Sequence, residues 1–322
     1  MAFRTSIATG IDITAKRAAY DAVCKRLISE KIILAWIMHS CLSEFRDIDI
    51  KTIAEKYIEG QPYVNQVPLN PDMTGAFLQN SAQEQTSPTE GDIYFDIYFR
   101  ATIPGKDEIV QLIINVEAQR DYYPGYPLVK RALYYCARML SAQKGTVFSH
   151  SEYDKLRKVY SIWLCLEPPQ YLRNSITAFH TTKDNILGNN PEQSSNYDLQ
   201  TVIMLGLDDA DKTQEEGIIK LLSVLLSNKM KANDKKHILQ TEFNIPMTQE
   251  LETEVNTMFD LSQSLIEEGE ARGIKLGIEQ NIIASIQSLM ATLKLSAQEA
   301  MKALRIPESE QSHYLEIMTN NC

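Results

Sequence analysis

Two strand-like segments lie close together in the sequence, GDIYFDIYFR at residues 91–100 and LIINVEAQRDYYPGY at residues 112–126. Both are rich in isoleucine, phenylalanine and valine, the residue types that favour a pleated, half-buried backbone. Each nevertheless carries a carboxylate in its middle, Asp96 in the first and Glu117 in the second. Burying a carboxylate is costly unless a partner compensates its charge. A divalent metal ion is a partner that would explain both residues.

Alternation along the two segments predicts an antiparallel hairpin with both carboxylates on one side. Successive side chains of a strand point to opposite faces. In the first segment Ile93, Phe95, Ile97 and Phe99 share one face, and Asp92, Tyr94, Asp96 and Tyr98 share the other. In the second segment Glu117 is opposite Val110, Leu112, Ile114, Val116 and Ala118. The intervening ATIPGKDE supplies a Pro-Gly turn, which is typical of a hairpin connection.

Length and composition describe an ordinary soluble protein with room for one large domain and a smaller one. The chain has 322 residues, of which 44% are hydrophobic and 23% charged, so it can bury a sizeable core. The apolar run IILAWIM at 32–38 is too short to span a bilayer, and the opening MAFRTSIATG lacks a signal-peptide pattern. Five cysteines without a CxxC pair favour a reducing compartment and argue against a structural zinc. We therefore expect a cytoplasmic protein without a membrane partner.

Charge is distributed unevenly along the chain. The net charge of -10 comes entirely from residues 181–322, because residues 1–180 carry equal numbers of acidic and basic side chains. Within the neutral part, residues 120–158 are rich in lysine and arginine. Such a segment predicts either a positive surface that attracts a phosphate backbone or an ordinary solvated helix face.

Helical spacing of apolar residues predicts two helices over 14–46, with a break near Ser29, and an amphipathic helix over 126–143 that stops by Gly145. The inward face of the amphipathic helix is expected to comprise Leu128, Ala132, Leu133, Cys136, Met139 and Leu140. A continuous apolar run at 159–167 predicts a central strand buried on both faces.

Further strands are expected at 175–180 and 199–206, whereas 60–90 is expected to be an extended connection with at most a short strand. The order of elements favours an α/β fold, a mixed sheet with helices on its faces.

The C-terminal part is predicted to be helical. One helix is expected at 215–230, and a longer stretch at 248–293 contains Gly269, Gly273 and Gly277. These glycines indicate either a pliable linker, the preferred interpretation, or close packing against a partner helix. Ser296 and Glu299 form a capping box that opens a terminal helix pair. The expected domains are a core over 1–210, a helical extension over 211–260 and a helical tail over 261–322.

The chemistry suggested by the hairpin is that of a magnesium site. Asp96 and the sequence Glu117-Ala118-Gln119 would supply two carboxylates on adjacent strands and a main-chain carbonyl between them. Mg²⁺ prefers carboxylate oxygens and retained waters. It can acidify a bound water and stabilise the charge that develops on a phosphodiester. Asp92 lies on the same strand face as Asp96 and is the alternative ligand.

Residues 90–169 resemble the PD-(D/E)xK nuclease-family transposases, which are related to the bacterial recombination-promoting nucleases. The resemblance rests on YFDIYF, IINVEAQRDYYPGYPLVKRALYYCARMLSAQKGT and KVYSIWLCLEPP, and extends more weakly to the helical N-terminus and tail. It implies a restriction-endonuclease-like core, a mixed four-stranded sheet flanked by helices, with an α-helical C-terminal extension. It also implies Mg²⁺-dependent hydrolysis of DNA, with Mn²⁺ as a substitute metal.

The resemblance assigns roles to particular residues. It implies that Asp96, Glu117 and the Ala118 carbonyl are metal ligands, and that Glu44 is an additional helical acid. Gln119 takes the place of the superfamily's lysine, and Phe95 replaces its proline. Glutamine can position a water by hydrogen bonding but cannot supply lysine's positive charge.

Two functions from different classes follow. The first is a DNA endonuclease in which Asp96, Glu117 and Gln119 form the catalytic site and Lys130, Arg131 and Arg138 contact the DNA backbone. The second is a catalytically impaired relative that binds DNA or a protein without cleavage. The helical tail is expected to mediate homo-oligomer formation.

Overall fold

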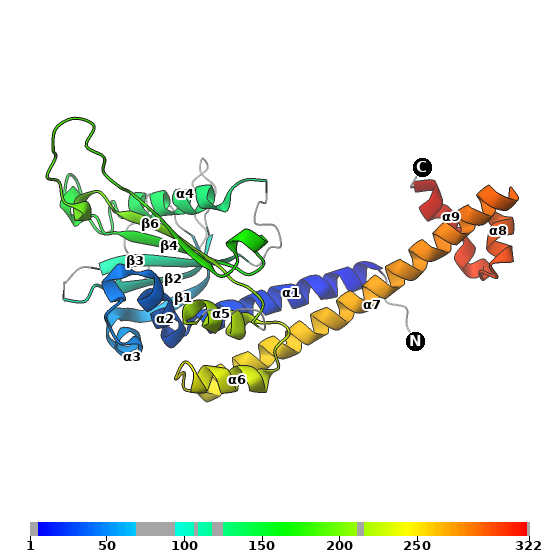
Figure 1. Cartoon of the computed structure of the whole chain (residues 1–322), viewed down its shortest axis with the longest axis horizontal. Helices are drawn as coiled ribbons and strands as arrows, with labels where there is room; N and C mark the ends of the chain where they lie inside the picture. The colour runs from blue at the N-terminus through cyan, green and yellow to red at the C-terminus, as the bar shows by residue number, and fades with distance from the viewer. Residues whose placement is uncertain (1–5, 69–93, 106–108, 118–124, 211–215, 321–322) are drawn as a thin grey trace. The chain divides into compact units, whose positions relative to one another are not determined.

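A computed structural model describes residues 6–68, 94–105, 109–117, 125–210 and 216–320 (Figure 1). The chain divides into two compact units. One comprises residues 14–262, and the other comprises residues 1–13 together with 263–322. In the described part of the chain no helix is long and apolar enough to cross a bilayer.

The first unit is built on a mixed sheet in which the described residues form six strands, in the spatial order β1-β2-β3-β4-β6-β5. The strands are β1 (Ile58–Pro68), β2 (Tyr94–Thr102), β3 (Ile109–Glu117), β4 (Val159–Cys165), β5 (Ser175–His180) and β6 (Gln200–Gly206). β3, β4 and β6 are parallel to one another, while β1, β2 and β5 each pair antiparallel with their neighbours. The predictions of a mixed α/β sheet and of an antiparallel hairpin are confirmed.

β1 is longer than the sequence suggested. Where at most a short strand was expected, an 11-residue strand pairs with β2. Its pairing is interrupted by two irregularities, and Gly60 adopts a positive φ of 60°. Pro62 and Pro68 are unusual residues within a strand, but β1 lies at the edge of the sheet, where a missing backbone donor is tolerated.

β4 is the central strand, as its apolar run predicted. All seven of its residues are buried, and it has a parallel neighbour on each side. Tyr160, Ile162 and Leu164 belong to the core on one face, whereas Val159, Trp163 and Cys165 belong to the core on the other. Alternation along one strand therefore contributes to two separate cores.

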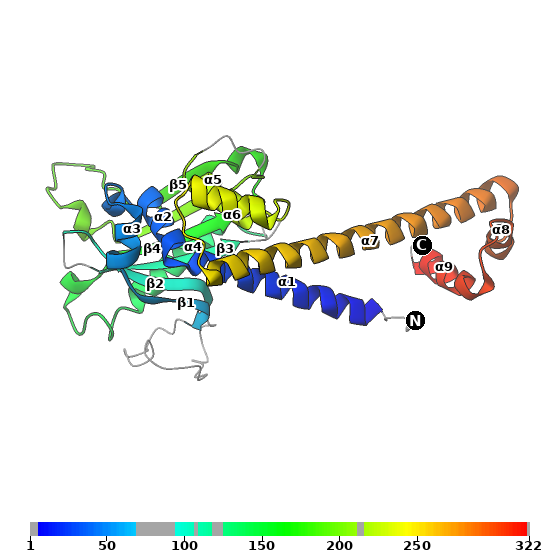
Figure 2. The same ribbon diagram turned by 90° about the horizontal axis from the view of Figure 1, so that it is seen from below.

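Helices cover both faces of the sheet (Figures 1 and 2). The larger core is formed with α1 (Ser6–Ser29), α2 (Lys31–Cys41), α5 (Ile218–Leu226), α6 (Ala232–Thr241) and the first turns of α7 (Gln249–Leu293). The opposite face is covered by α4 (Leu128–Ser141). The short α3 (Ile50–Thr52) follows α2. The predicted helix break near Ser29 is confirmed. Side chains between residues 218 and 258, within the predicted helical extension, pack in the same core as the sheet.

α4 confirms the predicted amphipathic helix, but one residue predicted to face inward is exposed. Leu128, Ala132, Cys136 and Met139 are buried against the sheet. Leu133 was predicted to face inward, and it is 37% exposed. At about 100° per residue, position 133 is turned well away from the line through 128, 132 and 139, whereas Tyr135 lies on that line and is buried.

Lys235 in α6 is fully buried in the first unit. Its exposed fraction is 0%, and Nζ donates a hydrogen bond of 3.1 Å to the carbonyl oxygen of Leu225 in the last turn of α5. Burial lowers the pKa of Lys235 to about 8, although nearby Cys24 partly opposes this shift. The folded state therefore binds the Lys235 proton less tightly than the unfolded chain, whose lysine titrates near 10.5.

Replacing Lys235 by methionine is expected to remove a pH dependence of stability. Between pH 8 and about 10.5 the unfolded wild type binds more protons than the folded one, so its free energy of unfolding rises with pH. The rise from Lys235 amounts to at most about 3 kcal/mol, at about 1.4 kcal/mol per pKa unit. In urea unfolding at pH 7 and pH 10, the stability of Lys235→Met relative to wild type should decrease with pH. If the difference in unfolding free energy between Lys235→Met and wild type were the same at pH 7 and pH 10, the lowered pKa of the buried Lys235 would be contradicted.

The second unit is helical. It contains the later part of α7, α8 (Ala297–Ala303) and α9 (Glu308–Asn320). Ile286, Ala300, Met301 and Tyr314 form its small core. The predicted capping box is confirmed, because the Ser296 hydroxyl accepts from the Glu299 backbone and the Glu299 carboxylate accepts from the Ser296 backbone. The terminal helix pair is likewise confirmed.

The three glycines of α7 lie inside a continuous helix. Gly269, Gly273 and Gly277 are exposed, and a Cβ atom added to any of them would meet nothing within 4 Å. This stretch is therefore helical throughout, and its interpretation as a pliable linker stays a prediction. Their positions leave room for side chains on the helix surface.

Replacing Gly273 by alanine is expected to stabilise α7 by about 1 kcal/mol, because alanine restricts the unfolded chain and leaves less backbone open to water. The expected result is a higher melting temperature by circular dichroism at 222 nm for the full chain. A lower melting temperature would contradict an unobstructed helix surface and indicate that a partner packs against this glycine.

Candidate functional site

The candidate site lies at the end of the sheet where β3 and β4 finish. β2 runs antiparallel to β3, so the start of β2 and the end of β3 are at the same end of the sheet. Asp96 is the third residue of β2 and Glu117 is the last residue of β3. The fold therefore brings these two positions, which are 21 residues apart in the sequence, to one end of the sheet.

Positions 96 and 117 also belong to the same face. Position 117 pairs in register with Cys165, which packs in the α4 core. Tyr98, two residues after Asp96, packs in that core too. The shared face predicted for the hairpin is thus confirmed for the backbone positions. Ala118 and Gln119 lie outside the described residues.

Asp96 forms an ion pair with a lysine that the sequence did not single out. Lys25 in α1 places Nζ 2.8 Å from Asp96 Oδ1 and 2.6 Å from Asp21 Oδ2. The side chains of Lys25 and Asp96 are 15% and 24% exposed. Burial lowers the pKa of Lys25, but the hydrogen bonds with Asp21 and Asp96 outweigh it and the pKa is raised. One ammonium group is therefore shared by two carboxylates, and it compensates part of the charge of Asp96 without a metal.

Lys25 belongs to a helix whose neighbouring residues pack on the other face of the sheet. Cys24 and Ile28 of α1 pack in the larger core, on the face opposite α4. Lys25 reaches Asp96 nevertheless, because Asp96 is close to the end of its strand. The signal in the sequence was an Asp–Lys pair four residues apart on a helix, which places both side chains on one helix face. That pattern is common and does not by itself indicate a site.

Another acidic residue lies near α1 at this end. The pKa of Tyr20 is raised by burial first, and further by the neighbouring Cys24 and by the charge of Glu167. Glu167 is exposed and follows β4 by two residues. Burial likewise raises the pKa of the Cys24 thiol to about 12, so this thiol stays protonated at neutral pH.

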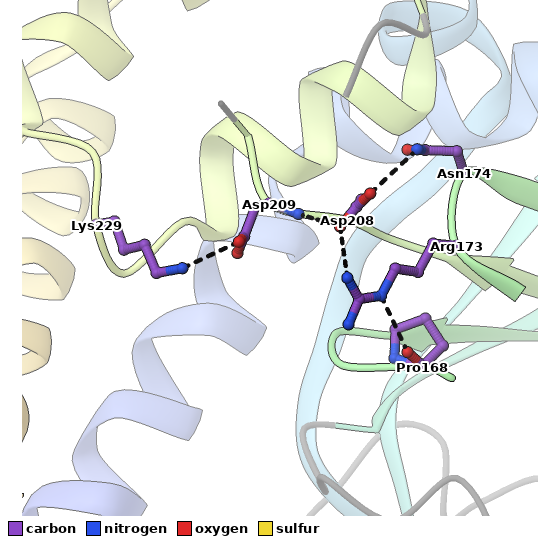
Figure 3. Close-up of polar contacts among 6 residues, drawn as sticks. All are labelled: Pro168, Arg173, Asn174, Asp208, Asp209 and Lys229. Carbon is purple, nitrogen blue, oxygen red and sulfur yellow. Dashed lines mark hydrogen bonds and ion pairs between the residues drawn. The ribbon is translucent and has the colours of Figure 1, made fainter. Parts of the chain in front are cut away.

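A polar network holds the loops that follow β4 and β6 (Figure 3). Asp208 accepts hydrogen bonds of 3.3 Å from both Arg173 Nη1 and Asn174 Nδ2, and Arg173 Nε donates to the Pro168 carbonyl at 3.4 Å. Beside it, Lys229 Nζ is 3.0 Å from Asp209 Oδ2. The network ties the segment after β4 to the segment after β6, so it supports the end of the sheet that carries the candidate site.

Glu44 lies away from the candidate site, contrary to its assignment as a metal ligand. It is in the 3₁₀ turn Ser43–Phe45 and accepts a hydrogen bond from the Tyr160 hydroxyl. Tyr160 packs in the core opposite α4. It precedes Cys165, the partner of position 117, by five residues, or roughly 16 Å at about 3.3 Å per residue. The prediction for Glu44 is wrong, because its helix packs on the other face and near the other end of β4.

Two of the three predicted DNA contacts are engaged inside the protein. Arg138 is 6% exposed, and its Nη1 lies 3.4 Å from the Tyr134 hydroxyl, so its assignment to the DNA backbone is wrong. The Arg131 guanidinium lies 5.3 Å from the Tyr135 ring centroid and 5.5 Å from that of Trp163. It contributes to packing through cation–π contacts.

Lys130 remains as an exposed basic residue in the first turn of α4. α4 connects the parallel strands β3 and β4, so it begins near the end of β3 and runs back to the start of β4. At its far end the Gln143 side chain makes two 2.8 Å hydrogen bonds with the Arg157 backbone, just before β4. Lys130 is therefore at the same end of the sheet as Asp96.

The donor set for a metal is only partly described. In the described ranges no group of three or more His, Cys, Asp or Glu side chains is arranged to hold a metal ion. Diagonal positions on neighbouring strands are about 7–8 Å apart, a separation that two carboxylates can bridge to one cation. Asp96 fits such a role if a cation binds beside Lys25 or takes the place of Lys25 at its carboxylate.

Comparisons with protein-family models, curated proteins and solved structures find no match to this chain.

Proposed function

We propose that this chain is a Mg²⁺-dependent DNA endonuclease of the recombination-promoting, transposase-associated type, with a restriction-endonuclease-like core of the PD-(D/E)xK family. The observation that carries the proposal is the common face and common end of positions 96 and 117. The parallel β3-α4-β4 crossover beside the antiparallel β2 supports the proposed architecture.

In the proposed mechanism the ends of β2 and β3 hold the metal and α4 holds the substrate. Asp96, Glu117 and the Ala118 carbonyl would bind Mg²⁺, with Mn²⁺ as a substitute. When bound, the metal acidifies water and stabilises negative charge on the phosphodiester. Gln119 would orient water by hydrogen bonding, and Lys130 would contact the DNA backbone.

A second candidate function is a catalytically impaired relative that binds DNA or protein without cleavage. The observation that favours it is the ion pair between Asp96 and Lys25, which already places a cation against the carboxylate. In a protein that had lost its metal, such an internal cation would stabilise the folded state, because an uncompensated carboxylate in a partly buried position is costly.

Location and assembly are part of the proposal. Cys24, Cys41 and Cys136 carry free thiols, which supports a cytoplasmic protein. Ile274 and Ile278, one turn apart on α7, are 64% and 57% exposed. Exposed apolar side chains on one helix face support homo-oligomer formation through the tail.

Nicking of supercoiled plasmid by the full-length chain tests the proposed function. Open-circular product is expected with Mg²⁺ or Mn²⁺ and not with excess EDTA. DNA binding without any product, under conditions in which both metals are present, would contradict the endonuclease and support the impaired relative.

A further inference from the structure

β5 ends the sheet without the features that usually protect an edge strand from pairing. In the described part of the chain no strand lies on its outer side. Its register with β6 is unbroken from Ser175 to His180, and it contains no proline, glycine, lysine, arginine or carboxylate. Natural edge strands are commonly blunted by proline, charge or a bulge. β1, the opposite edge, has two prolines and two irregularities in its pairing.

The side chains of β5 are open on both faces of the sheet. Ile176 and Ala178 pair in register with residues of the larger core, whereas Thr177 and Phe179 pair with residues of the α4 core. All residues from 176 to 180 are nevertheless exposed. Ile176 and Phe179, one on each face, are 43% and 40% exposed. The helices that cover the sheet therefore leave β5 uncovered.

Hydrogen bonding of β6 determines which backbone groups of β5 point outward. The Val159 N–H donates to the carbonyl of Leu199, so the odd-numbered residues along β6 face β4 and the even-numbered residues face β5. The even-numbered residues of β6 pair with odd-numbered residues of β5. Backbone groups alternate along a strand, so the N–H and C=O groups of Ile176, Ala178 and His180 point away from the sheet.

These outward groups are complementary to a second copy of the same strand. Antiparallel pairing around a twofold axis at Ala178 places Ala178 opposite itself and Ile176 opposite His180 of the partner subunit. Every residue in these pairs points outward, so each pair exchanges both backbone hydrogen bonds. An axis at position 177 or 179 would leave fewer such pairs. Between them, Phe179 lies opposite Thr177 of the partner subunit, and aromatic residues pair favourably with β-branched ones across strands.

The segments on either side of β5 carry further exposed apolar surface. Tyr171 before β5 is 70% exposed, and Ile186 and Leu187 after it are 99% and 97% exposed, the highest fractions among the large hydrophobic side chains described. The loop that carries Ile186 and Leu187 is held by a 3.3 Å hydrogen bond from the Asn190 backbone to Asn185 Oδ1. Antiparallel pairing directs this segment of one copy toward the segment before β5 of the other. Apolar surface of this kind is typical of association sites.

We propose that β5 is an interface between two copies of this chain, which pair antiparallel around Ala178 and join their sheets into one. The partner is a second copy because the strand is complementary to itself in register and in charge. The chain carries a net charge of -10, but β5 has no charged side chain that would oppose its own copy. A twofold axis repeats each contact and closes the assembly at a dimer. This interface belongs to the first unit and is independent of the proposed endonuclease function.

The first test measures the mass of the full-length chain by sedimentation over a series of concentrations. Wild type is expected to approach twice the chain mass of 36.6 kDa. Ala178→Pro removes an outward N–H and no hydrogen bond to β6, a position where an edge strand tolerates proline. Its dimer dissociation constant should rise by about 10-fold or more. Ala178→Thr is the matched control, because it keeps the N–H and favours a strand, and it should remain dimeric.

The second test places charges on the twofold axis. Ala178→Lys and Ala178→Glu each bring two like charges directly opposite one another, which destabilises a strand pair. Each variant alone is expected to be monomeric, whereas an equimolar mixture of the two should form a dimer. Ala178 is exposed, so both side chains fit the folded monomer. This comparison keeps the backbone N–H and provides the answer should Ala178→Pro fail to fold, which circular dichroism checks.

Three outcomes would overturn the β5 interface. The first is a wild-type chain that stays monomeric throughout the concentration series. The second is a dimer that persists in Ala178→Pro and in both charge variants but is lost in Ile278→Lys, which would place association in α7. The third is a mixture of the Lys and Glu variants at position 178 that stays monomeric although wild type is a dimer, because opposed positions 178 are the specific requirement of the proposed register.

Discussion

Asp96→Asn and Glu117→Gln are each expected to lower Mg²⁺-dependent nicking of supercoiled plasmid by about 10³-fold. Each substitution removes one negative charge and is nearly the same size as the original residue. Loss of a carboxylate that holds the metal removes several kcal/mol of transition-state stabilisation, and about 1.4 kcal/mol corresponds to a factor of ten in rate. Mn²⁺ affinity measured by calorimetry should fall in parallel, which separates a ligand from a residue that only supports the fold.

Two control variants make this result specific. Glu44→Gln should nick at the wild-type rate, because Glu44 bonds to Tyr160 on the other face of the sheet and glutamine can still accept that hydrogen bond. Asp92→Asn tests the alternative ligand, which lies outside the described residues. Loss of nicking in Asp92→Asn with full activity in Asp96→Asn would move the ligand to position 92. Equal activity of all four variants would contradict the site altogether.

Gly206→Ala is expected to destabilise the first unit by about 3 kcal/mol or more. A Cβ at Gly206 would lie 1.8 Å from the carbonyl oxygen of Leu172 and 2.9 Å from its carbonyl carbon. Backbone atoms cannot rotate out of the way as a side chain can. Overpacking costs about 1–3 kcal/mol even in cores that adjust. Urea unfolding of the full chain should show the loss as a lower midpoint.

The clash at Gly206 should also reach the candidate site. The Leu172 carbonyl accepts a 2.6 Å hydrogen bond from Ser175 Oγ, between the network around Arg173 and the start of β5. Displacing this segment would loosen the loops that follow β4 and β6. Gly273→Ala is the matched control, since the same added methyl meets nothing within 4 Å there. Equal melting temperatures for Gly206→Ala and wild type would contradict the close approach.

Local patterns in the sequence were sufficient to predict features that depend on a single short segment. The seven buried residues of β4 follow from a continuous apolar run, and the capping box at Ser296 follows from two residues three apart. β1 was underestimated, because its prolines and glycine are tolerated only at the edge of a sheet, and a local pattern does not show where the edge is. The exposure of Leu133 and of the α7 glycines was also beyond the reach of a local pattern, since exposure depends on what packs against a helix.

For the candidate site, too, local patterns predicted some features and the structure was needed for others. Alternation within the hairpin determined that positions 96 and 117 share a face, because strand period and turn chemistry are local properties. The structure alone showed that Lys25 pairs with Asp96, that Glu44 bonds to Tyr160 and that Arg138 is buried. Those contacts join residues that are 71 apart in one case and 116 apart in another.

Most strands and helices, and the shared face of the hairpin, thus follow from the sequence, since backbone propensity and hydrophobic period act over a few residues. Which charges meet follows from packing, because an ion pair forms wherever two side chains come within about 4 Å, at any distance along the chain.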